Sequence, residues 1–222
     1  MDHDSIPSED LIKNYFNYYN SLSKEEQKKI GILVPNIIDN NVKKKCFYIK
    51  DEGIYIKREL LTENNIIDDV ITSISSGSCV KVSVIKEIGL MISDLFIDYI
   101  DIEFSLRTQL YGYKIVAIGN AKLFHSLGNR KYFKVLGCKM LLNNHSPLRK
   151  YYIFRNRIFI WKKYYKHNIK YISFDFLLFI YEIFKIILFE DNKKSNFKNI
   201  FSGIKDGIFY NLDSNYSDRY FD

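Results

Sequence analysis

The sequence predicts an α/β fold followed by an all-helical region. Strand-like and helix-like patterns alternate up to about residue 125, which is typical of α/β domains. From His145 onward the chain contains long aromatic and basic stretches with helical spacing. Hydrophobic residues make up 47% of the 222 residues, which supports a core and argues against disorder. We predict an α/β domain over residues 1–145 and a basic, aromatic helical extension over residues 146–222.

The first predicted elements are a helix, a buried strand and a hairpin. Residues 7–10 read Pro-Ser-Glu-Asp, which favours a helix start, and apolar residues recur at helical spacing over 11–19. Residues 31–35 are predicted to form a short buried strand. Residues 46–50 and 54–57 flank the turn Asp-Glu-Gly and predict a hairpin.

The middle of the chain contains further alternating elements. Residues 66–73 predict a strand that runs into a polar turn, and residues 82–88 predict a helix that ends at Gly89. Asp101 is expected to cap a helix that reaches Leu110 and ends before Gly112.

The last third begins with two predicted strands and continues with helices. The strands cover residues 114–118 and 121–124. The helices run from His145-Ser-Pro to about Lys166 and over residues 174–189. The tail after Glu190 is polar and aromatic, and its pattern predicts no particular element.

The charge distribution limits the classes of partner. The net charge is +7, and residues 149–205 hold thirteen Lys or Arg against four acids. Such a surface suits nucleic acid, an anionic membrane or a phosphorylated small molecule. No nucleic-acid-binding motif is present, and the acids at 98–103 argue against that class.

Cysteine usage and hydropathy indicate the compartment. Cys46, Cys79 and Cys138 are few and widely spaced, so no disulfide framework is expected and a reducing compartment fits. No signal peptide and no apolar run of roughly 18 residues is found. We expect a cytoplasmic protein that is peripheral on the inner face of the cell membrane.

Two acidic segments are candidates for chemistry. Asp2 and Asp4 can both face one hard cation such as Mg²⁺, although an acidic terminus is also an ordinary solvated segment. Asp98, Asp101 and Glu103 stand in an apolar frame. A carboxylate at a helix start can serve as a base, but it can also be only a cap.

A histidine and a basic segment complete the set of candidates. His125 follows a predicted strand and can ligate a metal beside carboxylates, or be a hydrogen-bonded structural residue. Arg149 and Arg155 have guanidinium groups suited to phosphate oxygens, or belong to a basic amphipathic helix.

The order of these segments and the residues within them resemble those of bacterial family 2 glycosyltransferases of the rhamnosyltransferase type. The resemblance covers about residues 1–160. It is carried by Asp-His-Asp-Ser at 2–5, Ser-Gly-Ser at 76–78, Phe-Ile-Asp-Tyr-Ile-Asp-Ile-Glu-Phe at 96–104, His-Ser-Leu-Gly at 125–128 and His-Ser-Pro-Leu-Arg-Lys-Tyr-Tyr-Ile-Phe-Arg-Asn at 145–156.

The resemblance implies a fold, a reaction and partners. The fold would be GT-A, a Rossmann-like α/β domain. The enzyme would transfer a sugar with inversion from a nucleotide diphosphate to a lipid-linked glycan acceptor, using Mg²⁺ or Mn²⁺. The donor of first choice is dTDP-rhamnose, and UDP-galactofuranose is the alternative. Cell-surface polysaccharide synthesis is the expected process.

The resemblance also assigns roles to residues. Asp2, Asp4 and His125 would hold the metal, and Asp101 would be the catalytic base. The loop of Ser76, Gly77 and Ser78 would line the substrate pocket. The supporting and substrate-closing residues would be Asp98, Glu103, Arg149, Tyr152 and Arg155.

The resemblance begins at a motif that lies in the middle of such enzymes. We therefore expect the nucleotide-binding first half to be absent from this sequence, which would leave an exposed sheet edge and apolar face. A truncated, inactive form is one expectation. The alternative in another class is a non-catalytic remnant that acts as an interaction protein. The sequence does not indicate an oligomeric state.

Overall fold

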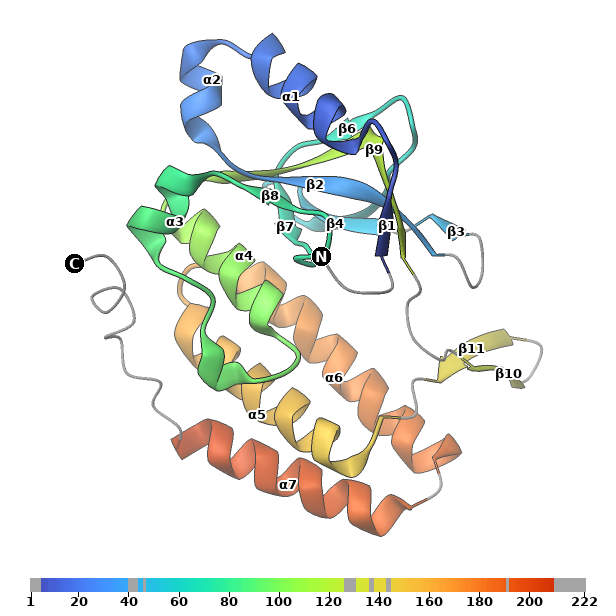
Figure 1. Cartoon of the computed structure of the whole chain (residues 1–222). Helices are drawn as coiled ribbons and strands as arrows, with labels where there is room; N and C mark the ends of the chain where they lie inside the picture. Colours follow the sequence, from blue (N-terminus) through green and yellow to red (C-terminus); the bar gives the residue numbers. More distant parts are fainter. Residues whose placement is uncertain are drawn as a thin grey trace. The chain divides into compact units, whose positions relative to one another are not determined.

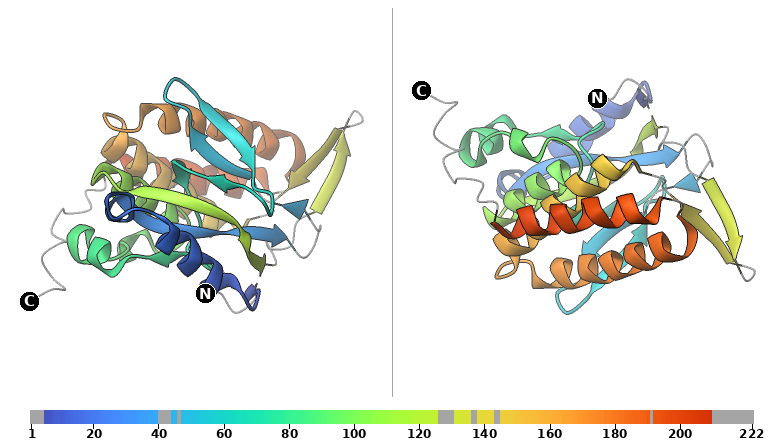
Figure 2. Two further views of the ribbon diagram at one scale, coloured as in Figure 1. Left: turned by 90° about the horizontal axis from the view of Figure 1, so that it is seen from above. Right: turned by 90° about the horizontal axis from the view of Figure 1, so that it is seen from below.

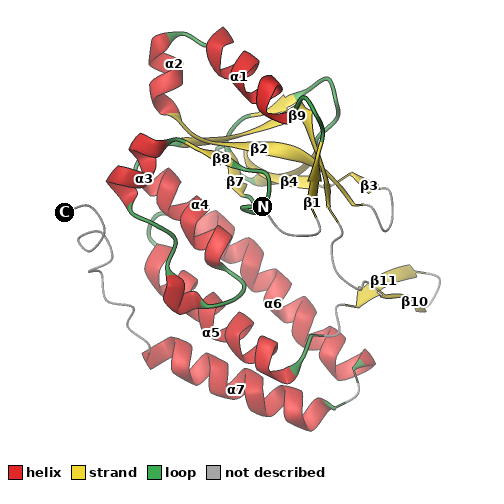
Figure 3. Cartoon of the chain, in the orientation of Figure 1, coloured by secondary structure: helices red, strands yellow, loops and turns green. Residues whose placement is uncertain are grey.

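The protein consists of two compact units whose sequences are interleaved. The computed structural model describes residues 5–39, 44–45, 47–125, 131–135, 138–142, 145–190 and 192–209. The first unit is built from segments within 1–92 and 100–126, and the second from segments within 93–99 and 127–212. Figure 1 and Figure 3 show that the strands of the sheets alternate with helices before the last three helices follow. The predicted α/β fold with a helical extension is confirmed, and the division at residue 145 remains a prediction.

The first unit contains the sheets. Its helices are α1 (Leu11–Ser21), α2 (Lys24–Lys29), α3 (Val82–Ile88) and α4 (Ile100–Leu110). Its strands are β1 (Ser5–Pro7), β2 (Ile30–Asp39), β3 (Lys44–Lys45), β4 (Phe47–Asp51), β5 (Ile56–Leu60), β6 (Ile66–Ile67), β7 (Val70–Thr72), β8 (Cys79–Val80) and β9 (Lys114–His125).

The second unit is mainly helical. It holds a 3₁₀ turn (Ser93–Leu95), a hairpin of β10 (Lys131–Val135) and β11 (Cys138–Leu142), and the helices α5 (Pro147–Tyr164), α6 (Ile169–Phe189) and α7 (Lys193–Phe209).

The main sheet is organised around the parallel pair β2 and β9. The strand order is β1-β9-β2-β3, with β6 also paired to β9 and β8 also paired to β2. The connection between β2 and β9 carries the small sheet β5-β4-β7 and the helices α3 and α4. A long crossover of this kind is what a parallel pair requires. The two segments predicted as separate strands at 114–118 and 121–124 form the single strand β9, which contains a register shift.

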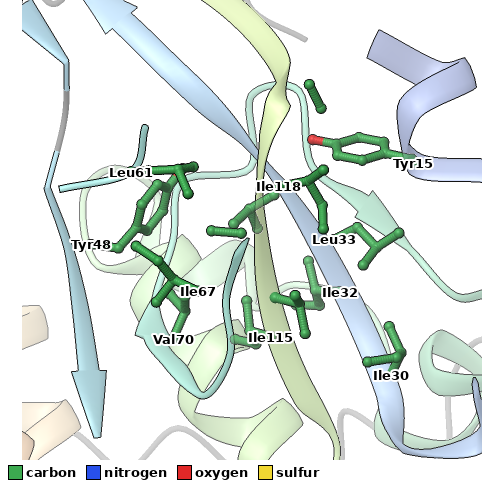
Figure 4. Packing of buried hydrophobic residues seen from close by; sticks show 14 of the residues in the cluster. Tyr15, Ile30, Ile32, Leu33, Tyr48, Leu61, Ile67, Val70, Ile115 and Ile118 are labelled. Carbon is green, nitrogen blue, oxygen red and sulfur yellow. The ribbon is translucent and has the colours of Figure 1, made fainter. Parts of the chain in front are cut away.

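The core of the first unit surrounds β2 and β9. β2 is buried along almost its whole length, and Val34, Val116 and Ala117 have no exposed surface. Figure 4 shows side chains from α1, β2, β4, β7 and β9 packed around these strands. Full burial of one such aliphatic side chain contributes ~1.5–3 kcal/mol. A continuous apolar run is typical of a strand covered on both faces, which explains why residues 31–35 were recognisable as a strand.

An apolar groove lies on the first unit beside α1 and the paired strands β2 and β8. Its volume is about 330 Å³. Ile12 and Phe16 on α1 are 68% and 65% exposed beside it. The other lining residues are Tyr15, Tyr19, Ile30, Gly31, Leu33, Cys79 and Lys81.

The second unit is built on α5, which packs closely against α7 (Figure 2, right). A Cβ added at Gly203 would lie 2.4 Å from the carbonyl oxygen of Tyr151, and one at Gly207 would lie 2.6 Å from that of Arg155. The two glycines therefore permit the approach of the two helix backbones. After Glu190, where the sequence pattern predicted no particular element, α7 occupies Lys193–Phe209.

No helix in the described part of the chain is both long and apolar enough to cross a membrane.

Candidate active site

Asp101 lines a small pocket in the first unit. The pocket has a volume of about 70 Å³ and is also lined by Ser73, Ser78, Met91 and Ser105. α4 begins at Ile100, so Asp101 lies in its first turn and is not the N-cap that the sequence predicted. The first turn favours a carboxylate anion because free backbone N–H groups and the helix dipole lie there. The arrangement suits a group that accepts a proton.

The loop of Ser76, Gly77 and Ser78 reaches the same pocket. Gly77 has a φ of 72°, and a Cβ there would lie 2.9 Å from Leu123 and 3.1 Å from Pro35. Its carbonyl oxygen accepts a hydrogen bond of 2.9 Å from the hydroxyl of Tyr15. Burial raises the pKa of the Tyr15 hydroxyl above its ordinary value, so this donor remains protonated. The structure thus brings together Ser78 and Asp101, which are distant in sequence.

His125 lies at the carboxyl end of β9, where three strands meet. Its Nδ1 and the hydroxyl of Ser5 are 2.7 Å apart. β1 pairs with β9 so that Ser5 opposes His125. β2 ends at the same edge, and Asp39 is the register partner of His125 on that side. The carboxyl ends of parallel strands are where α/β sheets place ligand sites.

Asp39 is a candidate site residue that the sequence analysis missed. Its side chain is buried at the edge of the sheet, with 1% of its surface exposed. The usable signal was its position as the last residue of a buried apolar strand. Asp39 and His125 together offer the oxygen and nitrogen donors that Mn²⁺-like metals accept.

The predicted metal set is only partly within the described residues. Asp2 and Asp4 lie outside them, directly before Ser5 in the sequence. Within the described segments no group of three or more His, Cys, Asp or Glu forms a metal centre. His125 and Asp39 are register partners with donor atoms of the types that a divalent cation accepts, and the hydrogen bond to Ser5 orients the imidazole.

Glu103 supports the site from the interior. It is completely buried, and its carboxylate is 2.9 Å from the Nη2 of Arg107. Arg107 also donates to the carbonyl oxygens of Ile88, the last residue of α3, and of Leu90, two residues further on. Glu103 therefore fastens α4 to the end of α3 and fixes the helix that carries Asp101.

The loop Ser93–Tyr99 of the second unit carries Asp98 in a strained conformation. Phe96, Asp98 and Tyr99 have φ values of 61°, 60° and 62°. Such values cost on the order of 1–3 kcal/mol for each non-glycine residue and concentrate at functional sites. The amide of Asn156, which is fully buried, donates to the carbonyl oxygens of Leu95, Ile97 and Asp98 at 2.8, 2.9 and 3.0 Å. Asn156 therefore holds the strained loop on α5.

Asp98 and Arg149 form a two-pronged ion pair. The Nε and Nη2 atoms of Arg149 are 2.8 and 2.9 Å from the two carboxylate oxygens of Asp98. This hydrogen bonding raises the pKa of the Arg149 guanidinium. Burial and the nearby Arg149 lower the pKa of His145, so this imidazole is neutral at physiological pH.

Tyr152 and Arg155 continue the same side of α5. The Arg155 guanidinium carbon lies 4.9 Å from the centroid of the Tyr152 ring. Arg155 also donates to the carbonyl oxygen of Asp94 at 2.7 Å and to the side chain of Asn156 at 2.9 Å. The structure thus brings Asp98, Arg149, Tyr152 and Arg155 together in the second unit.

A buried polar cluster anchors the end of the loop. Arg157 is within 3.2 Å of Asp175 and within 2.9 Å of Glu182, and it also donates to the hydroxyl of Tyr99. Burial raises the pKa of Tyr99 well above its ordinary value, so its hydroxyl donates to Asp175 at 3.0 Å. The cluster connects α5, α6 and the last residue of the loop.

Comparison with known proteins gives one informative match. No family model matches the chain, and no solved structure matches it. The chain is 33% identical over 167 residues to the dTDP-rhamnosyl transferase RfbF of Shigella flexneri. The match covers 73% of this chain and 52% of that protein, so the chain spans about half the length of its relative. The chain is therefore similar in sequence to a glycosyltransferase, and specifically to one named as a rhamnosyl transferase.

Proposed function

We propose that this chain carries the catalytic part of an inverting rhamnosyltransferase that uses dTDP-rhamnose. The observation that carries the proposal is the pocket shared by Asp101 and Ser78, in a chain 33% identical to a dTDP-rhamnosyl transferase. The acceptor is a lipid-linked glycan in cell-surface polysaccharide synthesis.

Each residue has a role in this reaction. Asp101 accepts the proton of the acceptor hydroxyl while that oxygen attacks the sugar. The loop Ser76–Ser78 borders the reacting groups, and Glu103 fixes α4. Asp2, Asp4, His125 and Asp39 would hold Mg²⁺ or Mn²⁺. When bound, the cation would neutralise the charge on the departing diphosphate.

The experiment uses a hybrid enzyme, because the chain covers half of its relative. The matched region of this chain replaces the corresponding region of the Shigella flexneri protein, and transfer of labelled rhamnose from dTDP-rhamnose to membrane acceptor is measured. We expect the hybrid to transfer rhamnose, and Asp101→Asn to reduce kcat by about 10²–10⁴. The control is Glu87→Gln on the surface of α3, because Glu87 is exposed, accepts a hydrogen bond from Tyr113 and does not line the pocket of Asp101.

Two outcomes would contradict the proposal. Transfer that continues undiminished in the Asp101→Asn hybrid would remove the proposed base. Transfer from UDP-galactofuranose in place of dTDP-rhamnose would replace the donor while keeping the reaction class.

We also propose that the second unit binds an anionic membrane surface. α6 exposes large apolar side chains, and the C-terminal end of α5 exposes Lys163 and, just beyond it, Lys166. Apolar side chains beside basic ones suit the interface of an anionic bilayer. The exposed apolar residues of α6 are Ile169, Phe176, Leu177, Leu178, Ile180, Tyr181, Phe184, Ile187 and Leu188.

Co-sedimentation with vesicles tests this location. We expect binding to vesicles that contain anionic lipid and little binding to neutral ones. The double variant Lys163→Gln with Lys166→Gln should weaken it. Lys162 is a poorer choice because it donates to the carbonyl oxygen of Ile208 at the end of α7. A dimer that forms equally with and without vesicles would favour packing of α6 against protein instead.

A further inference from the structure

Phe96 is an exposed aromatic residue held in a strained conformation. Its side chain is 67% exposed and its φ is 61°. Burial would explain a strained aromatic residue in a core, but most of this ring is in contact with solvent. A glycine would adopt the same backbone conformation without strain. Strain that stability does not require is typical of a binding site.

The ring of Phe96 lies beside a second aromatic ring on α5. The centroids of Phe96 and Tyr152 are 5.0 Å apart, and the planes are inclined by 41°. Arg155 covers Tyr152 at 4.9 Å and fixes that ring from α5. Tyr151 lies edge-on to Tyr152 at 5.1 Å. The two rings therefore form a supported aromatic surface.

A polar pair borders this surface. Arg149 and Tyr152 are three residues apart on α5, so they are neighbours on one side of the helix. Their partners Asp98 and Phe96 are two residues apart in the loop. The Arg149 and Asp98 side chains remain 41% and 23% exposed while paired. Their hydrogen-bonding groups are thus available at the edge of the aromatic surface.

We propose that Phe96 and Tyr152, bordered by Asp98 and Arg149, form a platform for a pyranose ring of the acceptor glycan. The C–H groups on one face of a pyranose pack on aromatic rings, and its hydroxyls need donors and acceptors at the edge. The platform provides both. The assignment to the acceptor rests on the proposed transferase function.

The same contacts disfavour a phosphate group at this place. Arg149 is already matched by the two oxygens of Asp98, and that carboxylate repels an anion. Arg155 is directed to Asp94 and to the side chain of Asn156. A neutral, polyhydroxylated ring fits this balance of charge better than a diphosphate.

Ligand-observed NMR on the 222-residue protein tests the platform. The probes are methyl α-L-rhamnopyranoside, methyl β-N-acetylglucosaminide and methyl α-galactopyranoside, with inorganic pyrophosphate as competitor. We expect saturation transfer to the ring protons of at least one glycoside, undisturbed by pyrophosphate. Phe96→Ala and Phe96→Gly should abolish it, and Phe96→Trp should retain it. The matched control is Phe201→Ala on α7, because Phe201 is 71% exposed in the same unit.

The melting temperature distinguishes a binding role from a structural one. Phe96→Gly should lose the glycoside signal while its Tm stays the same or rises, because the backbone strain is relieved. The proposal is overturned if all glycosides fail to bind the unchanged protein, if Phe96→Gly still binds, if pyrophosphate displaces the glycoside, or if Tm falls together with binding.

The binding test is independent of turnover. Glycoside binding that depends on Phe96 in a chain without transferase activity would support the platform and leave the proposed function to the hybrid assay. An active hybrid whose glycoside binding ignores Phe96 would overturn the platform alone.

Discussion

At the scale of single residues, the candidate site depends on polar groups placed at the ends of secondary structure elements. Asp101 was identifiable because an acid stood where a helix should begin. Asp39 was not identifiable, because it is distinguished only by its position at the end of β2, and the sequence did not show where that strand ends. His125 and Asp39 meet only through the pairing of β2 with β9. A single sequence without that pairing does not place them together.

Asn156 should be more important for stability than its size suggests. Asn156→Ala removes three hydrogen bonds to carbonyl oxygens of the loop, one of them fully buried, and we expect a loss of about 2–3 kcal/mol in the free energy of unfolding. Urea denaturation measures this. Asn199→Ala, which removes one bond to Ser195 on the surface of α7, should change it by less than about 0.5 kcal/mol. Equal effects would contradict the proposed hold on the loop.

His145 should make stability dependent on pH. Burial, chiefly, and Arg149 lower its pKa from 6.5, although Asp98 and Glu182 act in the opposite direction. The unfolded chain therefore binds a proton more readily, and stability falls as pH decreases below about 6.5. Denaturation at several pH values should show a smaller decrease in His145→Gln. The exposed His167, changed to Gln, serves as control, and an unchanged decrease in His145→Gln would refute the assignment.

At the scale of elements, the sequence predicted what local rules determine. Helix 82–88 and its glycine end are confirmed, since Gly89 has a φ of 82°. The predicted hairpin of residues 46–50 and 54–57 is present as β4 (Phe47–Asp51) and β5 (Ile56–Leu60), with Cys46 outside the described residues. The strand expected at 66–73 is divided into β6 and β7, because Asp69 adopts a φ of 56° between them. The break at Asp69 lets β6 pair with β9 in the main sheet and β7 pair with β4 in the small sheet, and these tertiary pairings are not visible in the local sequence.

Helix α7 was missed because its glycines disfavour a helix locally. The glycines Gly203 and Gly207 matter only in the tertiary structure, where they allow the backbone of α7 to lie close to that of α5. Gly203→Ala should place a methyl group against the Tyr151 carbonyl oxygen, and we expect a loss of about 1–3 kcal/mol by thermal denaturation. Ser202→Ala on the same turn should have little effect. A variant at Gly203 that is as stable as the parent would show that α7 packs less closely than the structure indicates.

At the scale of the whole molecule, the match to the rhamnosyl transferase covers only about half of that protein. We predict that the isolated 222-residue protein does not turn over dTDP-rhamnose, because the unmatched half of the relative has no counterpart in this comparison. Release of dTDP in the presence of Mg²⁺ or Mn²⁺ is the measurement. Metal-dependent transfer by the isolated chain would contradict this prediction.

The interleaving of the two units has a consequence for any attempt to exchange parts between such proteins. The helices of the second unit bind Ser93–Tyr99, a stretch that ends 28 residues before residue 127 (127 − 99) and is flanked on both sides by first-unit sequence. A gene segment cut at residue 127 would leave Asn156 and Arg157 without the carbonyl and hydroxyl groups that they bind. We therefore expect the C-terminal helices to lose these contacts when they are transferred to another protein without residues Ser93–Tyr99.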